Sequence, residues 1–256
     1  MIERETAQEI LNALPGQLDA PRLLLVGVGG AGINMLRTVE PEAGLRKVAF
    51  DTDNYALALS QVPRQVHLRT DLPRGTGGDP DIGEATARRQ REDLRRMLDG
   101  DIVLILAGLG RGTGTGVAPE VARLAKEGDI PVLAFLAWPF ANEDLGPAAQ
   151  QGQEAMEGTC DGLVVLDNEA AFALAGIETR SDAAQMVNAT IGRVLLDLCD
   201  RVHDAFPFNV REELADFIGS VPEGDAELPV RAAQWDDPQK KSSPLPVDPR
   251  GIVEFR

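Results

Sequence analysis

The chain has 256 residues, of which 43% are hydrophobic and 26% are charged, the balance of a folded globular protein. Its 25 basic and 41 acidic residues give a formal net charge of −16, which argues against nucleic-acid binding and against docking on an anionic membrane surface. The two cysteines fit neither a disulfide scaffold nor a zinc site. The start has no apolar signal core, and no apolar run reaches the ~18 residues of a membrane span, so we expect a cytoplasmic protein without a transmembrane segment.

From residue 22 onward, short apolar runs alternate with longer helix-like segments. Most runs are continuously apolar, as in strands buried on both faces: Leu23–Val28, Lys47–Phe50, Gln65–Leu68, Ile102–Ala107, Val132–Leu136 and Leu163–Leu166. The helical segments between and after them are Ile33–Val39, Asp53–Leu59, Gly83–Leu98, Gly116–Lys126, Pro147–Glu157 and Ser181–Ala205. This alternation predicts an α/β fold, a doubly wound and mostly parallel sheet with helices on both faces.

Three parts of the chain are predicted. Residues 1–21 form an N-terminal helical extension, and residues 22–220 form the main domain, which includes the long central helix 181–205. Residues 221–256 hold six of the 17 prolines, a composition typical of an extended or disordered tail. The tail is a candidate docking segment for a protein partner.

The first predicted strand runs into a glycine-rich segment, Gly27-Val28-Gly29-Gly30-Ala31-Gly32-Ile33-Asn34. Small residues let the backbone approach a phosphate closely, and the helix that follows directs free N–H groups and its positive dipole end at that anion. Gly27, Gly29 and Gly32 also satisfy the G-x-G-x-x-G pattern, and Asp51 stands near the position of a ribose-binding acid. On this segment alone, an NAD-dependent oxidoreductase is a serious alternative.

A second glycine-rich segment, Gly108–Gly116, follows the strand predicted at 102–107 and precedes another helix. It offers a second set of backbone N–H donors, to which Thr113 and Thr115 add hydroxyl groups. It is not a P-loop, because no Gly-Lys-Ser/Thr follows. Two such segments from neighbouring strands can hold one polyphosphate from two sides, whereas a dinucleotide dehydrogenase normally needs one.

Within this segment, Gly110-Arg111-Gly112-Thr113-Gly114-Thr115-Gly116 resembles the signature of the tubulin and FtsZ superfamily. Further segments resemble FtsZ in register across residues 22–206, and the resemblance implies a GTP-binding domain with GTP or GDP and Mg²⁺ as ligands. These segments are Leu25–Asn34, Phe50–Asp53, Gly75–Gly83, Trp138–Glu143 and Leu166–Ala170.

The resemblance also implies roles for particular residues. Asp53 and the Gly77-Gly78 turn would lie near the terminal phosphate and its Mg²⁺, whose ligands are not identified. Asn34 would reach the nucleotide, Glu143 would hold the ribose and Asn168 the guanine. The phosphates would be bound by the two glycine-rich segments, through Gly29, Gly30, Ala31, Gly32, Gly110, Arg111, Gly112, Thr113, Gly114 and Thr115.

Four positions depart from the family pattern. Arg111 replaces a glycine; its guanidinium pairs with a phosphate, points to solvent, or crowds the segment if this position needs a positive φ. Pro147 stands where the family usually has an arginine, and Ala184 where the central helix usually offers Asp or Asn to the guanine. Asp51 replaces an asparagine and adds negative charge near the phosphates, where a metal would then be needed.

In the family, acidic residues after the central helix complete the active site of the next subunit. If a short insertion is allowed, Glu212, Glu213 and Asp216 are the candidate catalytic acids here, acting in trans. The alternative is a capped helix start, with Asn209 as N-cap and Glu212 as its box partner. We also expect the family's second domain to be missing, which would weaken head-to-tail self-association.

Together these observations predict guanine-nucleotide binding by an FtsZ-like protein, with slow or assembly-dependent hydrolysis of GTP. The expected setting is the cytoskeleton, cell division or membrane remodelling. Two alternatives remain, a nucleotide-gated scaffold that does not hydrolyse GTP and the NAD-dependent oxidoreductase. The expected partners are further copies of the chain or a protein docked on the tail, and not nucleic acid.

Overall fold

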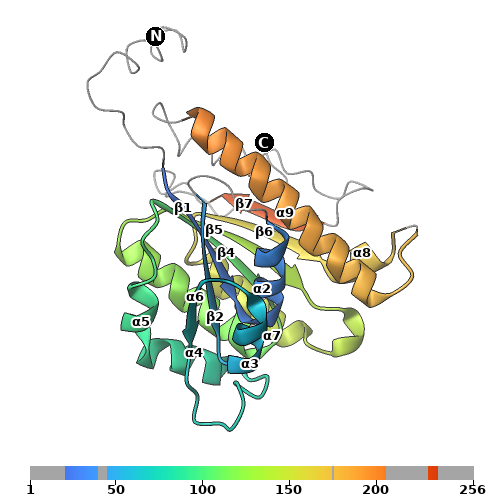
Figure 1. Ribbon diagram of the computed structural model, residues 1–256. Helices are drawn as coiled ribbons and strands as arrows, with labels where there is room; N and C mark the ends of the chain where they lie inside the picture. The colour runs from blue at the N-terminus through green and yellow to red at the C-terminus, as the bar shows by residue number, and fades with distance from the viewer. Residues whose placement is uncertain (1–20, 40–44, 175, 206–229, 236–256) are drawn as a thin grey trace, which may run out of the picture.

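In this computed structural model the described residues are 21–39, 45–174, 176–205 and 230–235. Their strands form one sheet in the order β3-β2-β1-β4-β5-β6-β7 (Figure 1). Strands β1 to β6 run parallel to their neighbours and β7 is antiparallel to β6, so the predicted doubly wound, mostly parallel sheet is confirmed. The strands are β1 (Leu23–Val28), β2 (Leu45–Asp51), β3 (Arg64–His67), β4 (Ile102–Gly108), β5 (Val132–Trp138), β6 (Gly162–Asp167) and β7 (Val230–Trp235).

The central strands are buried on both faces. Every residue of β1 is buried, as is every residue of β4 and β5 except the last. Because side chains alternate along a strand, β1 contributes to two hydrophobic cores: Leu23 and Leu25 pack into one, Leu24 and Val26 into the other. This explains why the sequence shows continuous apolar runs rather than alternating ones.

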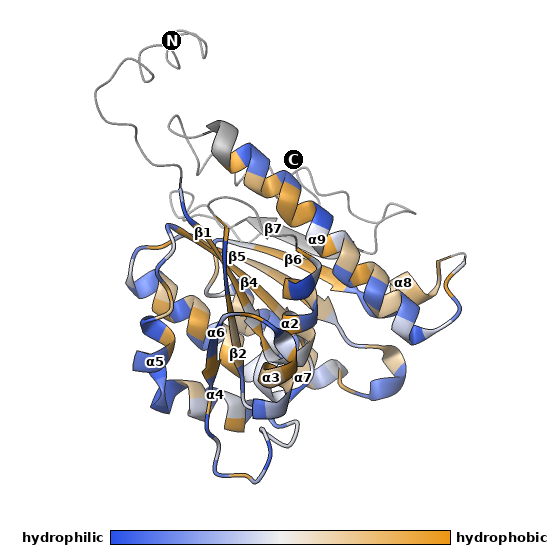
Figure 2. Ribbon diagram, in the orientation of Figure 1, coloured by the Kyte–Doolittle hydropathy of each residue, from blue (hydrophilic) through white to orange (hydrophobic). Residues whose placement is uncertain are grey.

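Helices cover both faces of the sheet, and the hydrophobic strands lie between them while the outer surfaces of α4 and α5 are largely hydrophilic (Figures 1 and 2). One face carries α2 (Gly29–Thr38), α3 (Asn54–Ser60), α8 (Asn168–Phe172) and α9 (Arg180–Ala205). The other face carries α4 (Pro80–Arg89), α5 (Arg91–Arg95), α6 (Gly112–Glu127) and α7 (Gly146–Glu157). A short 3-10 turn, η1, spans Ala141–Glu143 between β5 and α7.

The longest helix, α9, matches the central helix predicted at 181–205 and packs beside α2 (Figure 1). Its apolar positions recur every three or four residues, which places them on one face of the helix. The fully or nearly fully buried residues on that face are Ala183, Val187, Ile191, Leu195, Leu198 and Val202.

Two helices begin earlier than predicted. Helix α2 starts at Gly29 rather than Ile33, and α6 starts at Gly112 rather than Gly116. The glycine-rich segments are therefore themselves the first helical turns. Glycine has a low intrinsic helix propensity, which is why the sequence pattern placed both starts too late. Packing outweighs propensity here, because both helices lie against β4.

The helix predicted over Gly83–Leu98 is instead two helices, α4 and α5. Helix α4 begins at Pro80, a residue suited to the first helical position, and the Asp79 side chain caps it. The break falls at Gln90. The side-chain amide of Gln90 donates a hydrogen bond to the backbone oxygen of Arg69 and accepts one from the backbone N–H of Arg69. These bonds tie the break to the segment that follows β3.

Part of the predicted tail belongs to the sheet. Residues Val230–Trp235 pair with β6 as strand β7, which differs from the prediction of a disordered segment at these six positions. Proline enrichment misled that prediction, since none of the tail's prolines falls between residues 230 and 237. Residues 1–20 and the remainder of the tail lie outside the described residues. Within the described part of the chain, no helix is long and apolar enough to span a membrane.

Candidate functional site

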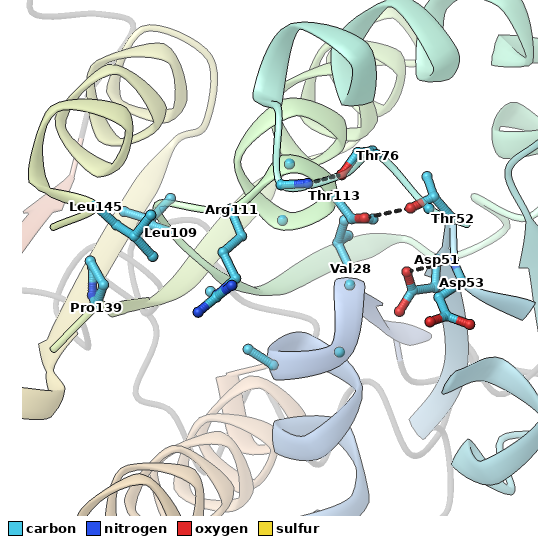
Figure 3. Close-up of a pocket in the computed structure, with 18 of the residues that line it drawn as sticks. Val28, Asp51, Thr52, Asp53, Thr76, Leu109, Arg111, Thr113, Pro139 and Leu145 are labelled. Atoms are coloured by element: carbon cyan, nitrogen blue, oxygen red, sulfur yellow. Dashed lines mark hydrogen bonds between the residues drawn. The ribbon is translucent and has the colours of Figure 1, made fainter. Parts of the chain in front are cut away.

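The switch point of the sheet lies between β1 and β4, because β1 leads into α2 on one face and β4 leads into α6 on the other. In open α/β sheets, ligands bind outside the carboxyl ends of the strands at such a point. A pocket of about 480 Å³ opens there, lined by residues at or beyond the carboxyl ends of all six parallel strands (Figure 3).

The two glycine-rich helix starts, Gly29–Ala31 and Gly112–Gly114, form one end of this pocket, which we call the glycine end. Gly29 has a φ of 72°, a conformation that L side chains rarely adopt. A Cβ atom on Gly29 would lie 3.1 Å from the backbone nitrogen of Gly114. The starts of α2 and α6 therefore approach each other at the backbone, which leaves no room for side chains between them.

Neither helix start has a side-chain cap hydrogen bond. In contrast, α3, α4 and α8 are capped by Asp53, Asp79 and Asp167. The first-turn N–H groups of α2 and α6 thus have no capping acceptor among the described side chains. Uncapped N–H groups and the positive end of the helix dipole together form a site for an anion such as phosphate.

The threonines of the second segment have different partners. The Thr113 hydroxyl lies 2.7 Å from the Thr52 hydroxyl at the pocket wall (Figure 3). The Thr115 hydroxyl accepts a hydrogen bond from the backbone N–H of Gly110 at 2.8 Å and is buried. Thr113 is therefore placed to meet a ligand, whereas Thr115 holds the segment in shape.

Two carboxylates lie at the glycine end beside Thr52 (Figure 3). Asp51 is 3% exposed, and burial raises the pKa of its carboxyl although it accepts an N–H bond from Asp53. Partial burial acts to raise the pKa of the Asp53 carboxyl. The hydrogen bonds that it accepts from the N–H of Tyr55 and from the guanidinium of Arg74 outweigh this effect and hold its pKa below the usual value. Arg74 Nε lies 3.0 Å from Asp53 Oδ2.

Asp51 and Asp53 could bind Mg²⁺ only if another molecule supplied further oxygen ligands to the metal. The described residues contain no group of three or more His, Cys, Asp or Glu side chains that could hold a metal ion. Mg²⁺ usually binds through one or two carboxylates together with phosphate oxygens and water. Asp51 and Asp53 therefore fit a magnesium ion that is shared with a bound phosphate.

Arg111, Glu143 and Asn168 form what we call the side-chain end of the pocket. Arg111 Nη2 lies 2.7 Å from Glu143 Oε1, and Glu143 Oε2 accepts the backbone N–H of Phe140 at 3.1 Å. Arg111 has φ −110° and ψ 167°, an ordinary extended conformation. The hypothesis that it crowds the segment is wrong, because the neighbouring Gly110 adopts the positive φ, 96°.

Most of the residues predicted to bind nucleotide are brought together here. Those that line the pocket are Gly29, Gly30, Ala31, Asp53, Gly77, Gly78, Arg111, Gly112, Thr113, Gly114, Glu143 and Asn168. Those that do not line it are Gly32, Asn34, Gly110 and Thr115. The candidate catalytic acids Glu212, Glu213 and Asp216 lie outside the described residues.

Sequence reasoning missed several lining residues. Thr52, Thr76 and Arg74 lie inside or beside segments that the resemblance had already marked, so a signal for them existed. The apolar wall consists of Leu109, Pro139 and Leu145 (Figure 3). Leu109 and Pro139 lie inside segments that were already marked, whereas no sequence signal marks Leu145. Pro147 and Ala184, which depart from the family pattern, are not lining residues.

An open, doubly wound sheet with two uncapped glycine-rich helix starts at its switch point defines an α/β domain suited to holding phosphate groups. The family model "Tubulin/FtsZ family, GTPase domain" matches residues 22–176. The chain belongs to this family, and the resemblance inferred from its motifs is confirmed. The NAD-dependent oxidoreductase alternative gains no support.

Curated relatives include archaeal cell division proteins. The chain is 36% identical to "Cell division protein FtsZ 2" of Haloferax volcanii over 173 residues, which cover 65% of this chain and 43% of that protein. It is 31% identical to "Cell division protein FtsZ 2" of Methanocaldococcus jannaschii over 210 residues, which cover 79% of this chain and 54% of that protein. The chain thus spans about half the length of these relatives.

Solved structures show the same fold. An empty FtsZ dimer of M. jannaschii matches with a TM-score of 0.68 and 30% identity, over 77% of this chain and 59% of that one. A GTPγS-bound protofilament of CetZ2 from Haloferax volcanii matches with a TM-score of 0.63 and 27% identity, over 72% of this chain and 58% of that one.

Proposed function

We propose that this chain binds guanine nucleotides, GTP and GDP, together with Mg²⁺, and hydrolyses GTP slowly when copies assemble. The setting we propose is a cytoskeletal or cell-division one, as the names of its relatives suggest. The observation that carries the proposal is the meeting of two uncapped helix starts at one pocket. That arrangement offers a polyphosphate two sets of backbone donors at once.

In this proposal the nucleotide lies along the pocket from the glycine end to the side-chain end. The N–H groups of α2 and α6 hold the phosphates, and Asp51 and Asp53 would hold Mg²⁺ shared with them. The metal would neutralise phosphate charge during transfer to water. Glu143 accepts hydrogen bonds from the ribose, and the Asn168 side chain pairs with the base.

Hydrolysis requires a group that positions the attacking water. We propose that Glu212, Glu213 or Asp216 of one copy serves the nucleotide of the next copy. Support comes from the family resemblance and from the FtsZ dimer and the CetZ2 protofilament among the similar structures. A head-to-tail contact of this kind would make hydrolysis depend on assembly.

The binding half of the proposal is tested with two glycine substitutions. Gly30 lines the pocket, and a Cβ atom there meets no protein atom within 4 Å, so Gly30→Ala should fold normally while its methyl occupies ligand space. Gly146 begins α7 outside the pocket lining and is equally open, so Gly146→Ala is the matched control. Calorimetry with GTP should show binding for the unmodified chain and Gly146→Ala, and loss for Gly30→Ala with an unchanged Tm.

The hydrolysis half is tested by phosphate release across a series of protein concentrations. Turnover per molecule should rise with concentration if the active site is shared. The triple variant E212Q/E213Q/D216N should bind GTP but release no phosphate. Mixing it with Gly30→Ala should restore part of the activity, because one variant supplies the nucleotide and the other the acids.

The outcomes separate the alternatives. If the unmodified chain does not bind GTP, the proposed function is wrong. If it binds GTP and releases no phosphate at any concentration, the scaffold alternative replaces the hydrolysis proposal. If the mixture stays inactive while the unmodified chain hydrolyses GTP, the acids do not act in trans.

A further inference from the structure

Two arginines line the pocket among the described residues, and each one holds a carboxylate that lines the same pocket. Arg74 pairs with Asp53 at the glycine end, and Arg111 pairs with Glu143 at the side-chain end. Both guanidinium groups belong to side chains that are largely exposed. The two arginines that could bind a phosphate are therefore already paired with carboxylates of the pocket.

The Arg111–Glu143 pair joins two segments that the backbone already brings together. Arg111 follows β4, and Glu143 follows the neighbouring strand β5. At Gly110, a Cβ atom would lie 2.7 Å from the Leu145 side chain, so the two segments approach closely beside the pair. The backbone N–H of Phe140 fixes one oxygen of the Glu143 carboxylate, and Arg111 occupies the other.

Arg111 also adjoins the α6 helix start. It is the residue immediately before Gly112, its backbone is extended, and its side chain makes no capping hydrogen bond to the helix. Figure 3 shows Arg111 between the apolar wall of Leu109, Pro139 and Leu145 and the polar residues around Thr113. A phosphate held at the start of α6 would therefore lie within the same stretch of pocket as the guanidinium.

A phosphate is the stronger competitor for this guanidinium. The Arg111 side chain is 69% exposed, and water screens an exposed ion pair so that it contributes little. Arginine binds phosphate through paired, charge-assisted hydrogen bonds in a matching planar geometry. Transfer of Arg111 from Glu143 to a phosphate exchanges a weak interaction for a stronger one.

We propose that the Arg111–Glu143 pair is an exchangeable latch that couples the phosphate and sugar halves of the nucleotide. The inference rests on the proposed function. A diphosphate or triphosphate draws the Arg111 guanidinium away from Glu143. The freed Oε1 of Glu143 then accepts a hydrogen bond from a ribose hydroxyl. A nucleoside alone must break the ion pair without supplying a phosphate partner for Arg111. Arg111 is therefore a specificity-determining residue that favours nucleotides with a polyphosphate chain.

The test uses the two halves of the ligand as separate probes, inorganic pyrophosphate and guanosine, followed by calorimetry and saturation-transfer NMR on the full chain. With the unmodified protein, saturating pyrophosphate should strengthen guanosine binding about two- to fivefold, the range expected for release of one exposed ion pair. In Arg111→Ala this coupling should vanish, because Glu143 is already free. GTP affinity of Arg111→Ala should fall about tenfold or more through loss of charged hydrogen bonds.

Arg96→Ala is the matched control, because the Arg96 side chain is 74% exposed and pairs with Asp93 on α5, outside the pocket lining. It should leave all affinities unchanged. Glu143→Gln supplies a second variant, in which pyrophosphate should bind more tightly because Arg111 is no longer held.

Equal losses of GTP and guanosine binding in Arg111→Ala would overturn the latch, since they would mean that Arg111 only positions Glu143. Unchanged GTP affinity in Arg111→Ala would also overturn it, while the proposed function would stand. Failure of the unmodified chain to bind GTP would remove both the proposed function and the latch.

Discussion

The two ends of the pocket present different chemical groups to a ligand. At the glycine end the donors are backbone N–H groups, and their positions are fixed by helices α2 and α6 packed on the sheet. At the side-chain end the groups belong to Arg111, Glu143 and Asn168, which come from three different strand ends. Backbone donors cannot be altered without altering the fold, whereas side chains can be exchanged one at a time. The glycine end should therefore tolerate little change, and the side-chain end should determine which ligand is preferred.

The largest effect is expected from Gly114→Ala. A Cβ atom there would overlap the backbone oxygen of Gly108 at the end of β4. Because backbone cannot move aside cheaply, we expect the free energy of unfolding to fall by about 1–3 kcal/mol and GTP binding to be lost. Urea denaturation and calorimetry measure the two effects.

Gly158→Ala is the control for this substitution. Gly158 is the C-cap of α7 with a φ of −76°, and a Cβ atom there would lie 3.7 Å from the nearest neighbouring atom, an ordinary contact. It should leave stability and binding nearly unchanged. Retention of GTP binding by a folded Gly114→Ala protein would show that the glycine end does not hold the phosphates.

The same contrast explains how far the sequence alone could lead. The glycines of the glycine end stand out in the sequence, because close backbone approach demands glycine and the demand repeats at Gly29, Gly112 and Gly114. Their role in binding phosphate stays a prediction. The helical character of these segments was missed, because the low helix propensity of glycine argues against a helix at positions where packing enforces one. At the side-chain end, the Arg111–Glu143 pair joins residues 32 positions apart in the sequence. Only the pairing of β4 with β5 makes them neighbours, and no local pattern expresses that.

Asn168→Ala tests the side-chain end. Asn168 is the first residue of α8, and Asp167 rather than Asn168 caps that helix. The substitution should therefore leave Tm unchanged. If the Asn168 amide pairs with guanine, the preference for GTP over ATP should fall about tenfold, as expected for loss of a hydrogen bond that discriminates between ligands. Competition calorimetry with the two nucleotides measures the preference.

Asn142→Ala provides the comparison for that experiment. Asn142 is exposed in η1 and does not line the pocket, so its loss should change neither affinity. An undiminished preference for GTP in Asn168→Ala would mean that the base is read by another group.

The smallest effect is expected from Asp51→Asn, which separates the charge of the glycine end from its backbone geometry. Burial raises the pKa of the Asp51 carboxyl, so the folded state favours the protonated form. Below the unfolded pKa of about 3.9 the carboxyl is neutral in both states, and the penalty of burying its charge appears as pH rises from there through the folded pKa. Asp51→Asn removes that penalty, so it should gain stability on the order of 1 kcal/mol near pH 7 and less near pH 3.5.

Asp101→Asn should show the opposite sign. Hydrogen bonds from Arg22 hold the pKa of the Asp101 carboxyl below its usual value, so its charge stabilises the fold above the unfolded pKa and ceases to do so as pH falls through the folded one. Its replacement should lower Tm near neutral pH and matter less in acid. Thermal melts of both variants from pH 3.5 to 7 check the pair of signs. If Asp51→Asn instead lost stability relative to the unmodified chain as pH rose, a favourable partner would stabilise the buried carboxylate. The shape of the glycine end would then depend in part on a side chain.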